Sequence, residues 1–121
     1  MPLQTVLTEL FGTWLNKVRG LHQIVLCDSV GIPIISAGNI AEHNDVSLSA
    51  ATSAIQGISE NFKVTFRNSS VEYVMVKMRG RKVMIWKLPT QNMYVLLYMS
   101  SPTVGTQRKM IKAIDYLVQL C

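Results

Sequence analysis

The spacing of apolar residues along the chain predicts three helices. In Leu3–Arg19 apolar side chains recur every three or four positions, and Gly20 follows as a stop. A second helix is expected over Val46–Glu60, with Asp45 as its N-cap, and a third over Val104–Leu120. The core stripes expected for the second and third helices are Leu48, Ala51, Ile55 and Ile58, and Met110, Ile111, Ile114, Leu117 and Val118.

Five strands are predicted between these helices. Leu21–Cys27 is apolar on both faces, and its turn Asp28-Ser29-Val30-Gly31 leads into a return strand over Ile32–Ala37. Pro33 cannot donate to a strand ladder, so the return strand is expected at a sheet edge. A three-stranded meander follows, and its last strand is apolar almost throughout, as in a central strand covered on both faces. The three strands of the meander are Val71–Met78, Lys82–Leu88 and Met93–Met99.

The order of elements predicts an α+β fold in one domain over residues 1–121. Helix, hairpin, helix, meander and helix together give a five-stranded, mainly antiparallel sheet with helices on both faces. The segment Asn61–Ser70 is expected to be a loop, within which Lys63–Phe66 could form a short strand.

The second helix has an unusual outward face. No charged residue occurs from Val46 to Ser59, and the positions opposite the core stripe are small or apolar. Such a face suits close approach of another helix better than it suits water, although a small-residue helix lying under a loop has the same pattern. The residues expected in a helix contact are Val46, Ala50, Ser53, Ala54 and Gly57.

Composition and charge also indicate a partner. Hydrophobic residues make up 49% of the 121 positions and charged residues only 16%, which is apolar for so small a domain. The net charge of +5 is uneven: residues 1–60 hold two basic and five acidic side chains, and residues 61–121 hold ten and two. The sharpest basic cluster would face an acidic partner or would be a solvated turn, and it consists of Lys77, Arg79, Arg81 and Lys82.

No motif for catalysis, for a cofactor or for a metal is found. The glycines form no phosphate loop, the acids are isolated, and no Gly-x-Ser-x-Gly elbow occurs. His22 and His43 show no ligand spacing, and Cys27 is expected to be a small core residue. Nucleic-acid binding is disfavoured because the aromatic residues near the basic cluster lie on core strands. The chain is therefore expected to be non-enzymatic.

Location is predicted from what the sequence lacks. Met1–Leu10 has neither the basic start nor the long apolar core of a signal peptide, and no apolar run approaches the ~20 residues that span a bilayer. An intracellular protein is expected, with any membrane location supplied by a partner.

The first hairpin carries a family resemblance. Gly20-Leu-His-Gln-Ile-Val-Leu-Cys-Asp-Ser-Val-Gly-Ile-Pro-Ile-Ile35 resembles the corresponding segment of the roadblock / dynein light-chain family. Within that family it is most similar to the MEK-partner subunits of Ragulator complexes. Thr103-Val104-Gly105 and Tyr116-Leu117-Val118 also resemble the sister subunit. The resemblance implies the roadblock fold, with one helix on one face of the sheet and the two terminal helices on the other.

The resemblance also implies how the chain would act. Two roadblock domains pair by laying their central helices antiparallel and joining their third strands edge to edge, as a heterodimer or a homodimer. Ragulator complexes lie on the cytoplasmic face of late endosomes and lysosomes through a lipidated subunit, and support Rag GTPases, TOR signalling and MAP-kinase pathway kinases. The alternatives are a small-GTPase regulator acting through Arg79 or Arg81, and a dynein-associated light chain. The strand residues expected in the pairing are Tyr73, Val74, Met75 and Val76.

Overall fold

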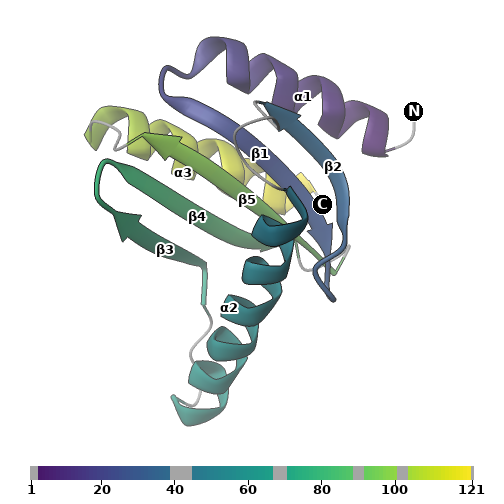
Figure 1. The fold of residues 1–121 in the computed structure, drawn as a ribbon, viewed down its shortest axis with the longest axis vertical. Coiled ribbons are helices and arrows are strands. Elements are labelled where there is room, and N and C mark those ends of the chain that lie inside the picture. The colour runs from purple at the N-terminus through teal and green to yellow at the C-terminus, as the bar shows by residue number, and fades with distance from the viewer. Residues whose placement is uncertain (1–2, 39–44, 67–70, 89–91, 101–103, 121) are drawn as a thin grey trace.

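The computed structural model describes residues 3–38, 45–66, 71–88, 92–100 and 104–120, without the side chains of residues 3, 45–49, 104 and 118–120. Three helices and five strands follow one another in the predicted order (Figure 1). Their bounds are α1 Leu3–Lys17, β1 Leu21–Asp28, β2 Pro33–Gly38, α2 Asp45–Thr65, β3 Tyr73–Met78, β4 Arg81–Leu88, β5 Met93–Ser100 and α3 Val104–Leu120.

The five strands form one sheet in the order β2-β1-β5-β4-β3, and each neighbouring pair is antiparallel. The all-apolar strand β5 lies in the centre, as its pattern predicts, and β2 with Pro33 lies at one edge. The other edge is β3, the first strand of the meander.

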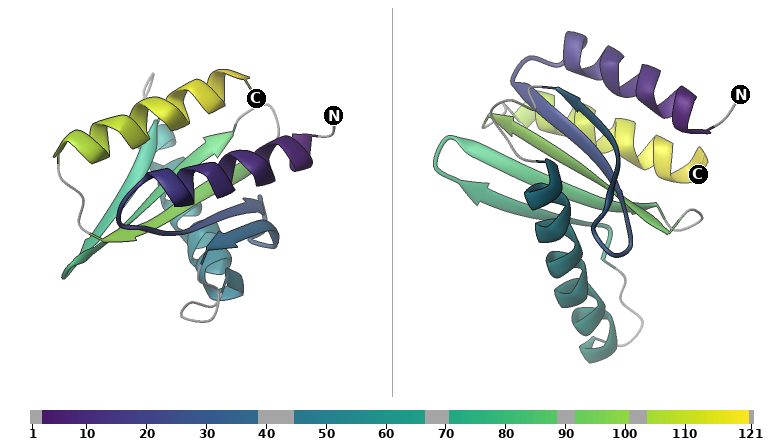
Figure 2. Two further views of the ribbon diagram at one scale, coloured as in Figure 1. Left: turned by 90° about the horizontal axis from the view of Figure 1, so that it is seen from above. Right: turned by 45° about the vertical axis from the view of Figure 1, so that its right-hand side comes forward.

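The helices divide unequally between the two faces. Both terminal helices, α1 and α3, lie on one face and α2 lies on the other (Figure 2). Alternation along β1 separates the two cores: Ile24 and Leu26 face the terminal helices, whereas Val25 and Cys27 face α2. The α+β fold expected from the sequence is confirmed, and Cys27 is a fully buried core residue as predicted.

Local chemistry explains the tight turns around β1. Gly20, with φ of +88°, ends the chain segment after α1 in a conformation that a residue with a Cβ rarely adopts. In the β1–β2 turn, one carboxylate oxygen of Asp28 accepts from the backbone N–H of Val30 and of Ile32, at 3.0 and 2.9 Å. Gly31 supplies the positive φ of +89° that closes this turn.

Two predictions about the second helix are wrong. Residues 61–65 continue α2 instead of forming a loop, and the short strand expected at Lys63–Phe66 is not formed, because Phe66 N donates to Phe62 O as in a helix. No glycine or proline interrupts the segment, so nothing in it stops the helix.

The buried stripe of α2 is also displaced by one residue from the prediction. Thr52 is fully buried and Ser59 is half-buried, whereas Ala51 is exposed and Ile58 is 55% exposed. Ile55 is half-buried and packs against the core as expected. The side chain of Leu48 lies outside the described part of the chain. The helix therefore turns small polar residues to the sheet and keeps apolar residues on its outer surface.

Candidate pairing surface

The outward face of α2 is apolar and open. Ala50, Ala54 and Gly57, three of the residues predicted for a helix contact, are exposed, and Ile58 lies beside them. Ser53 is half-buried, and its hydroxyl donates to the Ser29 carbonyl at 3.5 Å, so it belongs to the contact of α2 with the first hairpin. The predicted contact at Val46 lies outside the described side chains.

Gly57 has no role within the chain that requires glycine. It lies inside a helix, its φ is not positive, and a Cβ built on it would meet no atom within 4 Å. A glycine in a helix interior costs roughly 0.5–1 kcal/mol relative to alanine. The open space outside Gly57 is therefore compatible with close approach of another backbone, and the isolated fold gains nothing from it.

The C-terminal end of α2 extends the apolar face beyond the sheet. Phe62, Val64 and Phe66 are all exposed, and the rings of Phe62 and Phe66 lie 6.2 Å apart between centroids. These residues are absent from the contact that the sequence predicts, because a loop is expected over Asn61–Ser70. The spacing of four residues from Ile58 to Phe62 and on to Phe66 is the signal that could have found them.

Strand β3 leaves an edge without a neighbouring strand in the described sheet. Its inner edge pairs with β4 over its whole length, and it contains no proline that would block a further strand. Tyr73 and Met75 anchor it from the face of the terminal helices, where the Tyr73 ring lies 5.3 Å from that of Trp86. Val74 and Val76 point to the α2 side, and Val76 is 38% exposed.

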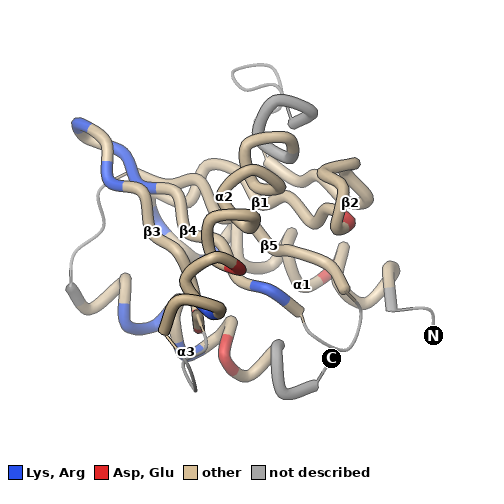
Figure 3. Tube along the Cα trace, turned by 90° about the horizontal axis from the view of Figure 1, so that it is seen from below, with Lys and Arg blue, Asp and Glu red and all other residues tan. Residues whose placement is uncertain are grey.

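The β3–β4 turn carries the predicted basic cluster, at one end of the molecule (Figure 3). Arg81 is engaged within the chain: one guanidinium nitrogen donates to Ser100 Oγ at 2.6 Å and lies 2.9 Å from His22 Nε2. The ammonium group of Lys82 donates to the Gln107 side-chain oxygen of α3 at 2.7 Å. The other two members of the cluster, Lys77 and Arg79, are exposed.

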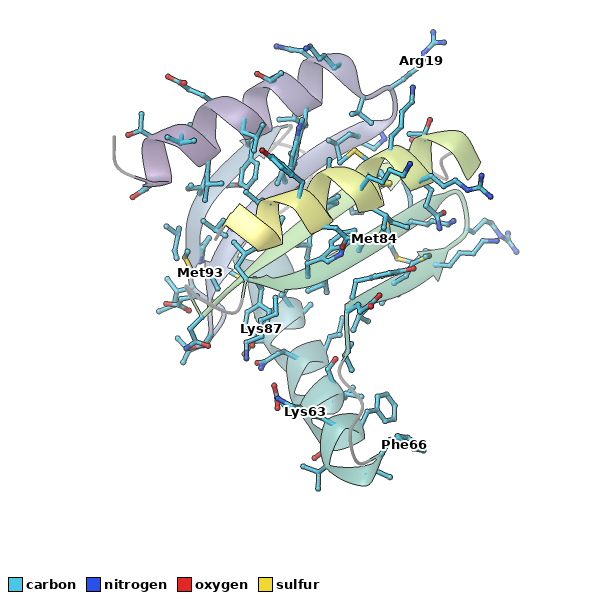
Figure 4. The ribbon with its side chains drawn as sticks, turned by 180° about the vertical axis from the view of Figure 1, so that it is seen from behind. Arg19, Lys63, Phe66, Met84, Lys87 and Met93 are labelled. Atoms are coloured by element: carbon cyan, nitrogen blue, oxygen red, sulfur yellow. The ribbon has the colours of Figure 1, made fainter. Side chains whose placement is uncertain are left out.

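A pocket of about 570 Å³ lies between α2 and the β3–β4 pair. Ile55, Val74 and Ile85 line its apolar part. At its rim Lys87 Nζ lies 3.9 Å from a Glu60 carboxylate oxygen, and Figure 4 places Lys87 and Lys63 on this side of the molecule.

Two buried polar atoms border this pocket. Within the described residues, the Tyr94 hydroxyl and the Trp86 indole N–H have no hydrogen-bond partner. Burial raises the pKa of the Tyr94 phenol above its usual 10.0, and the charges of Glu60 and Cys27 raise it further. The pocket therefore has a mixed lining: an apolar part, two unpaired polar atoms at its wall, and charged side chains that include Glu60, Lys63 and Lys87.

Among the residues that the structure describes, no three His, Cys, Asp or Glu side chains cluster as metal ligands. No described helix is long and apolar enough to cross a membrane. His22 lies 2.7 Å from Ser100 Oγ in a strand-surface network. His43 lies outside the described residues.

An antiparallel five-stranded sheet with two terminal helices on one face and a central helix on the other defines the roadblock fold. Residues 9–96, well over half of the chain, match the Roadblock/LC7 domain family. The chain belongs to this family.

Solved structures agree on the fold. The chain is similar to Myxococcus xanthus MglB, at a TM-score of 0.81 and 13% identity over 98% of this chain and 97% of that one. It is also similar to a Roadblock/LC7 domain from Streptomyces avermitilis, at a TM-score of 0.72 and 11% identity over 93% and 97%. A structure described as MglB with tetrameric arrangement gives a TM-score of 0.74 at 7% identity over 98% and 93%. No curated protein matches the chain.

Proposed function

We propose that this chain is a non-catalytic scaffold subunit that pairs with a second roadblock domain through the outward face of α2 and the edge of β3. The observation that carries the proposal is the continuity of two open surfaces. Both α2 and β3 line the pocket, and the same two elements carry the exposed apolar face and the open edge of the sheet.

The coverage of the sheet supports the same pairing. On one face α1 packs against β1 and β2, and α3 packs against β4. On the other face α2 packs on β1, β2 and β5, and the β3–β4 half carries the pocket instead of a helix. A helix from a partner, lying antiparallel beside α2, would cover that half and bury Ile58 and Val76.

The finer part of the proposal is a Ragulator-like role. The first hairpin, Gly20 to Ile35, supports it through its resemblance to the MEK-partner subunits. In this role the chain forms a heterodimer with a sister roadblock subunit, or a homodimer. It lies on the cytoplasmic face of late endosomes or lysosomes through a lipidated partner, and supports Rag GTPase–TOR and MAP-kinase signalling. Affinity purification from cells tests this role, and recovery of neither a roadblock subunit nor a Rag GTPase would refute it.

Ala50→Glu tests the pairing itself. A carboxylate at this exposed small residue would be buried without a counter-charge in a helix contact, which costs about 3 kcal/mol or more. We expect the variant to be monomeric by light scattering in the presence of a purified roadblock partner. The matched control is Thr5→Glu on the exposed face of α1, which should pair as the natural chain does. Equal pairing of both variants would show that α2 is not the contact.

A regulator of a small GTPase is the second candidate. Arg79 is exposed at the tip of the β3–β4 turn, where it could reach a bound nucleotide, whereas Arg81 is held by His22 and Ser100. GTP hydrolysis by the GTPases recovered with the chain distinguishes the two functions. A regulator accelerates hydrolysis and loses this activity on Arg79→Gln, whereas a scaffold leaves the rate unchanged.

A further inference from the structure

The terminal-helix side of the molecule carries a second charged surface that pairing through α2 and β3 does not use. Lys77 and Lys82 stand directly opposite each other on neighbouring strands, so both side chains lie on the face of α1 and α3. The bond from Lys82 to Gln107 joins this strand pair to α3. The cations around this contact are here called the basic face. They are Lys77 and Lys82 together with the exposed side chains of Arg79, Arg108, Lys109 and Lys112.

The basic face is electrostatically unfavourable in the isolated chain. Like charges directly opposite each other across a strand pair are destabilising. The hydrogen bond from the Lys82 ammonium group goes to the neutral amide of Gln107, which does not offset the charge as a carboxylate would. The first turn of α3 has no acidic residue, so the positive end of the helix dipole adds to the same field. An external anion would offset all three contributions.

Of the carboxylates whose side chains are described, all but Asp115 lie outside β3, β4 and α3. Glu9 is on α1, Asp28 is in the β1–β2 turn, and Glu60 is on α2. Glu72 borders the pocket beside α2. Asp115 also borders it, but this residue is on α3, one turn beyond Lys112. Figure 3 shows blue segments gathered on the β3–β4 hairpin and along α3, where one red segment lies toward the C-terminal end of the helix. In Figure 4, the side chain of Arg19, just after α1, lies on the same side of the molecule as the start of α3.

We propose that the basic face binds the surface of an anionic membrane, through the phosphate and carboxylate groups of acidic lipids. Clusters of four to eight Lys and Arg side chains on an amphipathic helix are typical of contact with acidic headgroups, and α3 carries Arg108, Lys109 and Lys112. With no described helix able to cross a bilayer, such a contact would be made by charge at the surface. This proposal does not depend on pairing.

Other polyanions fit the basic face less well. The centre of a protein interface is poor in charge and rich in aromatic and apolar anchors. The exposed large apolar side chains of the described residues lie on α1, α2, the first hairpin, the chain just before β3 and the α2 side of β3, with Tyr116 beyond Lys112 along α3. Single-stranded nucleic acid would need several exposed aromatic rings among the cations for base stacking, and among the described residues of α3 only Tyr116, next to Lys112, is an exposed aromatic ring.

Flotation of the 121-residue chain with vesicles tests the proposal. We expect binding to vesicles of phosphatidylcholine with phosphatidylserine at physiological ionic strength, loss of binding with added salt, and no binding to phosphatidylcholine alone. Lys109→Gln with Lys112→Gln should lower the partition coefficient about 25-fold, at roughly fivefold for each charge removed. Because both lysines are exposed, the thermal unfolding of the variant should be unchanged.

The matched control is Lys63→Gln with Lys87→Gln, which removes the same charge on the α2 side (Figure 4). We expect this variant to bind within about twofold of the natural chain, because interactions beyond a Debye length of about 8 Å are screened. Equal losses from the two pairs would overturn the proposal, since binding would then report net charge alone. Binding of single-stranded RNA or of a polyglutamate peptide at this ionic strength, without binding to the anionic vesicles, would also overturn it.

Discussion

The two faces of the sheet are built from the same alternating strands, yet one is complete and the other is not. On the α1/α3 side, two amphipathic helices close over a continuous core that includes Phe11, Trp86 and Ile114. On the other side a single helix covers part of the sheet, and its outer surface keeps Ile58 and Phe62 exposed. The first face stabilises the chain by itself, whereas the second has apolar surface left over for a partner.

The largest effect should come from breaking the completed face. Phe11→Ala removes a fully buried ring from α1 and should lower the free energy of unfolding by about 3–5 kcal/mol. The contrasting change is Ile58→Ala on the open face, which should alter stability by less than about 0.5 kcal/mol in an unpaired chain. Urea unfolding in the Ala50→Glu background measures both without a contribution from pairing. Similar losses from the two changes would contradict the division between the faces.

The two edges of the sheet allow a smaller and sharper comparison. Val76 on β3 and Ile34 on β2 are 38% and 37% exposed, so lysine at either position should perturb the isolated chain similarly. Val76→Lys should weaken pairing by about 1.5 kcal/mol or more, because it removes an apolar side chain from the contact and adds a charge to the edge. Ile34→Lys, next to Pro33, should leave pairing unchanged. Titration calorimetry with the roadblock partner measures both, and a loss from Ile34→Lys would move the contact to the other edge.

The same contrast explains what the sequence could predict. The helices α1 and α3, the central strand β5 and the Pro33 edge follow from local patterns, because each element buries its apolar side in the core of this chain. The apolar spacing predicts a core stripe of α2 that includes Ala51 and Ile58, whereas Thr52 and Ser59 face inward in the structure. Periodicity finds the apolar side of a helix, and it cannot tell whether that side faces the chain's own sheet or a partner.

The pocket is a further feature that the sequence did not predict. It brings α2 together with β3, β4 and β5, and only the packing of these distant segments shows that Tyr94 and Trp86 leave polar atoms unpaired there. The basic turn, in contrast, is visible in the sequence, but the engagement of Arg81 by His22 and Ser100 is not.

Gly57→Ala should change the stability of the isolated chain and the affinity of pairing in opposite directions. In the unpaired chain alanine fits without contact and favours the helix, so the free energy of unfolding should rise by about 0.5–1 kcal/mol. In the pair the added methyl group would hold the two helices apart, and affinity should fall. Chemical denaturation and titration calorimetry on the same variant measure the two effects. A gain in both quantities would show that the space outside Gly57 is solvent in the pair as well.

The smallest effect concerns Tyr94 at the wall of the pocket. Because the pKa of its phenol is raised in the folded chain, mainly by burial, the unfolded chain releases this proton at lower pH. The stabilising contribution is complete below pH 10.0 and is lost as the pH rises through the higher pKa of the folded state. The melting temperature of the natural chain should therefore fall more steeply above pH 10 than that of Tyr94→Phe, with the two curves parallel at neutral pH. Curves that stay parallel above pH 10 would mean that the hydroxyl is as well solvated in the folded chain as in the unfolded one.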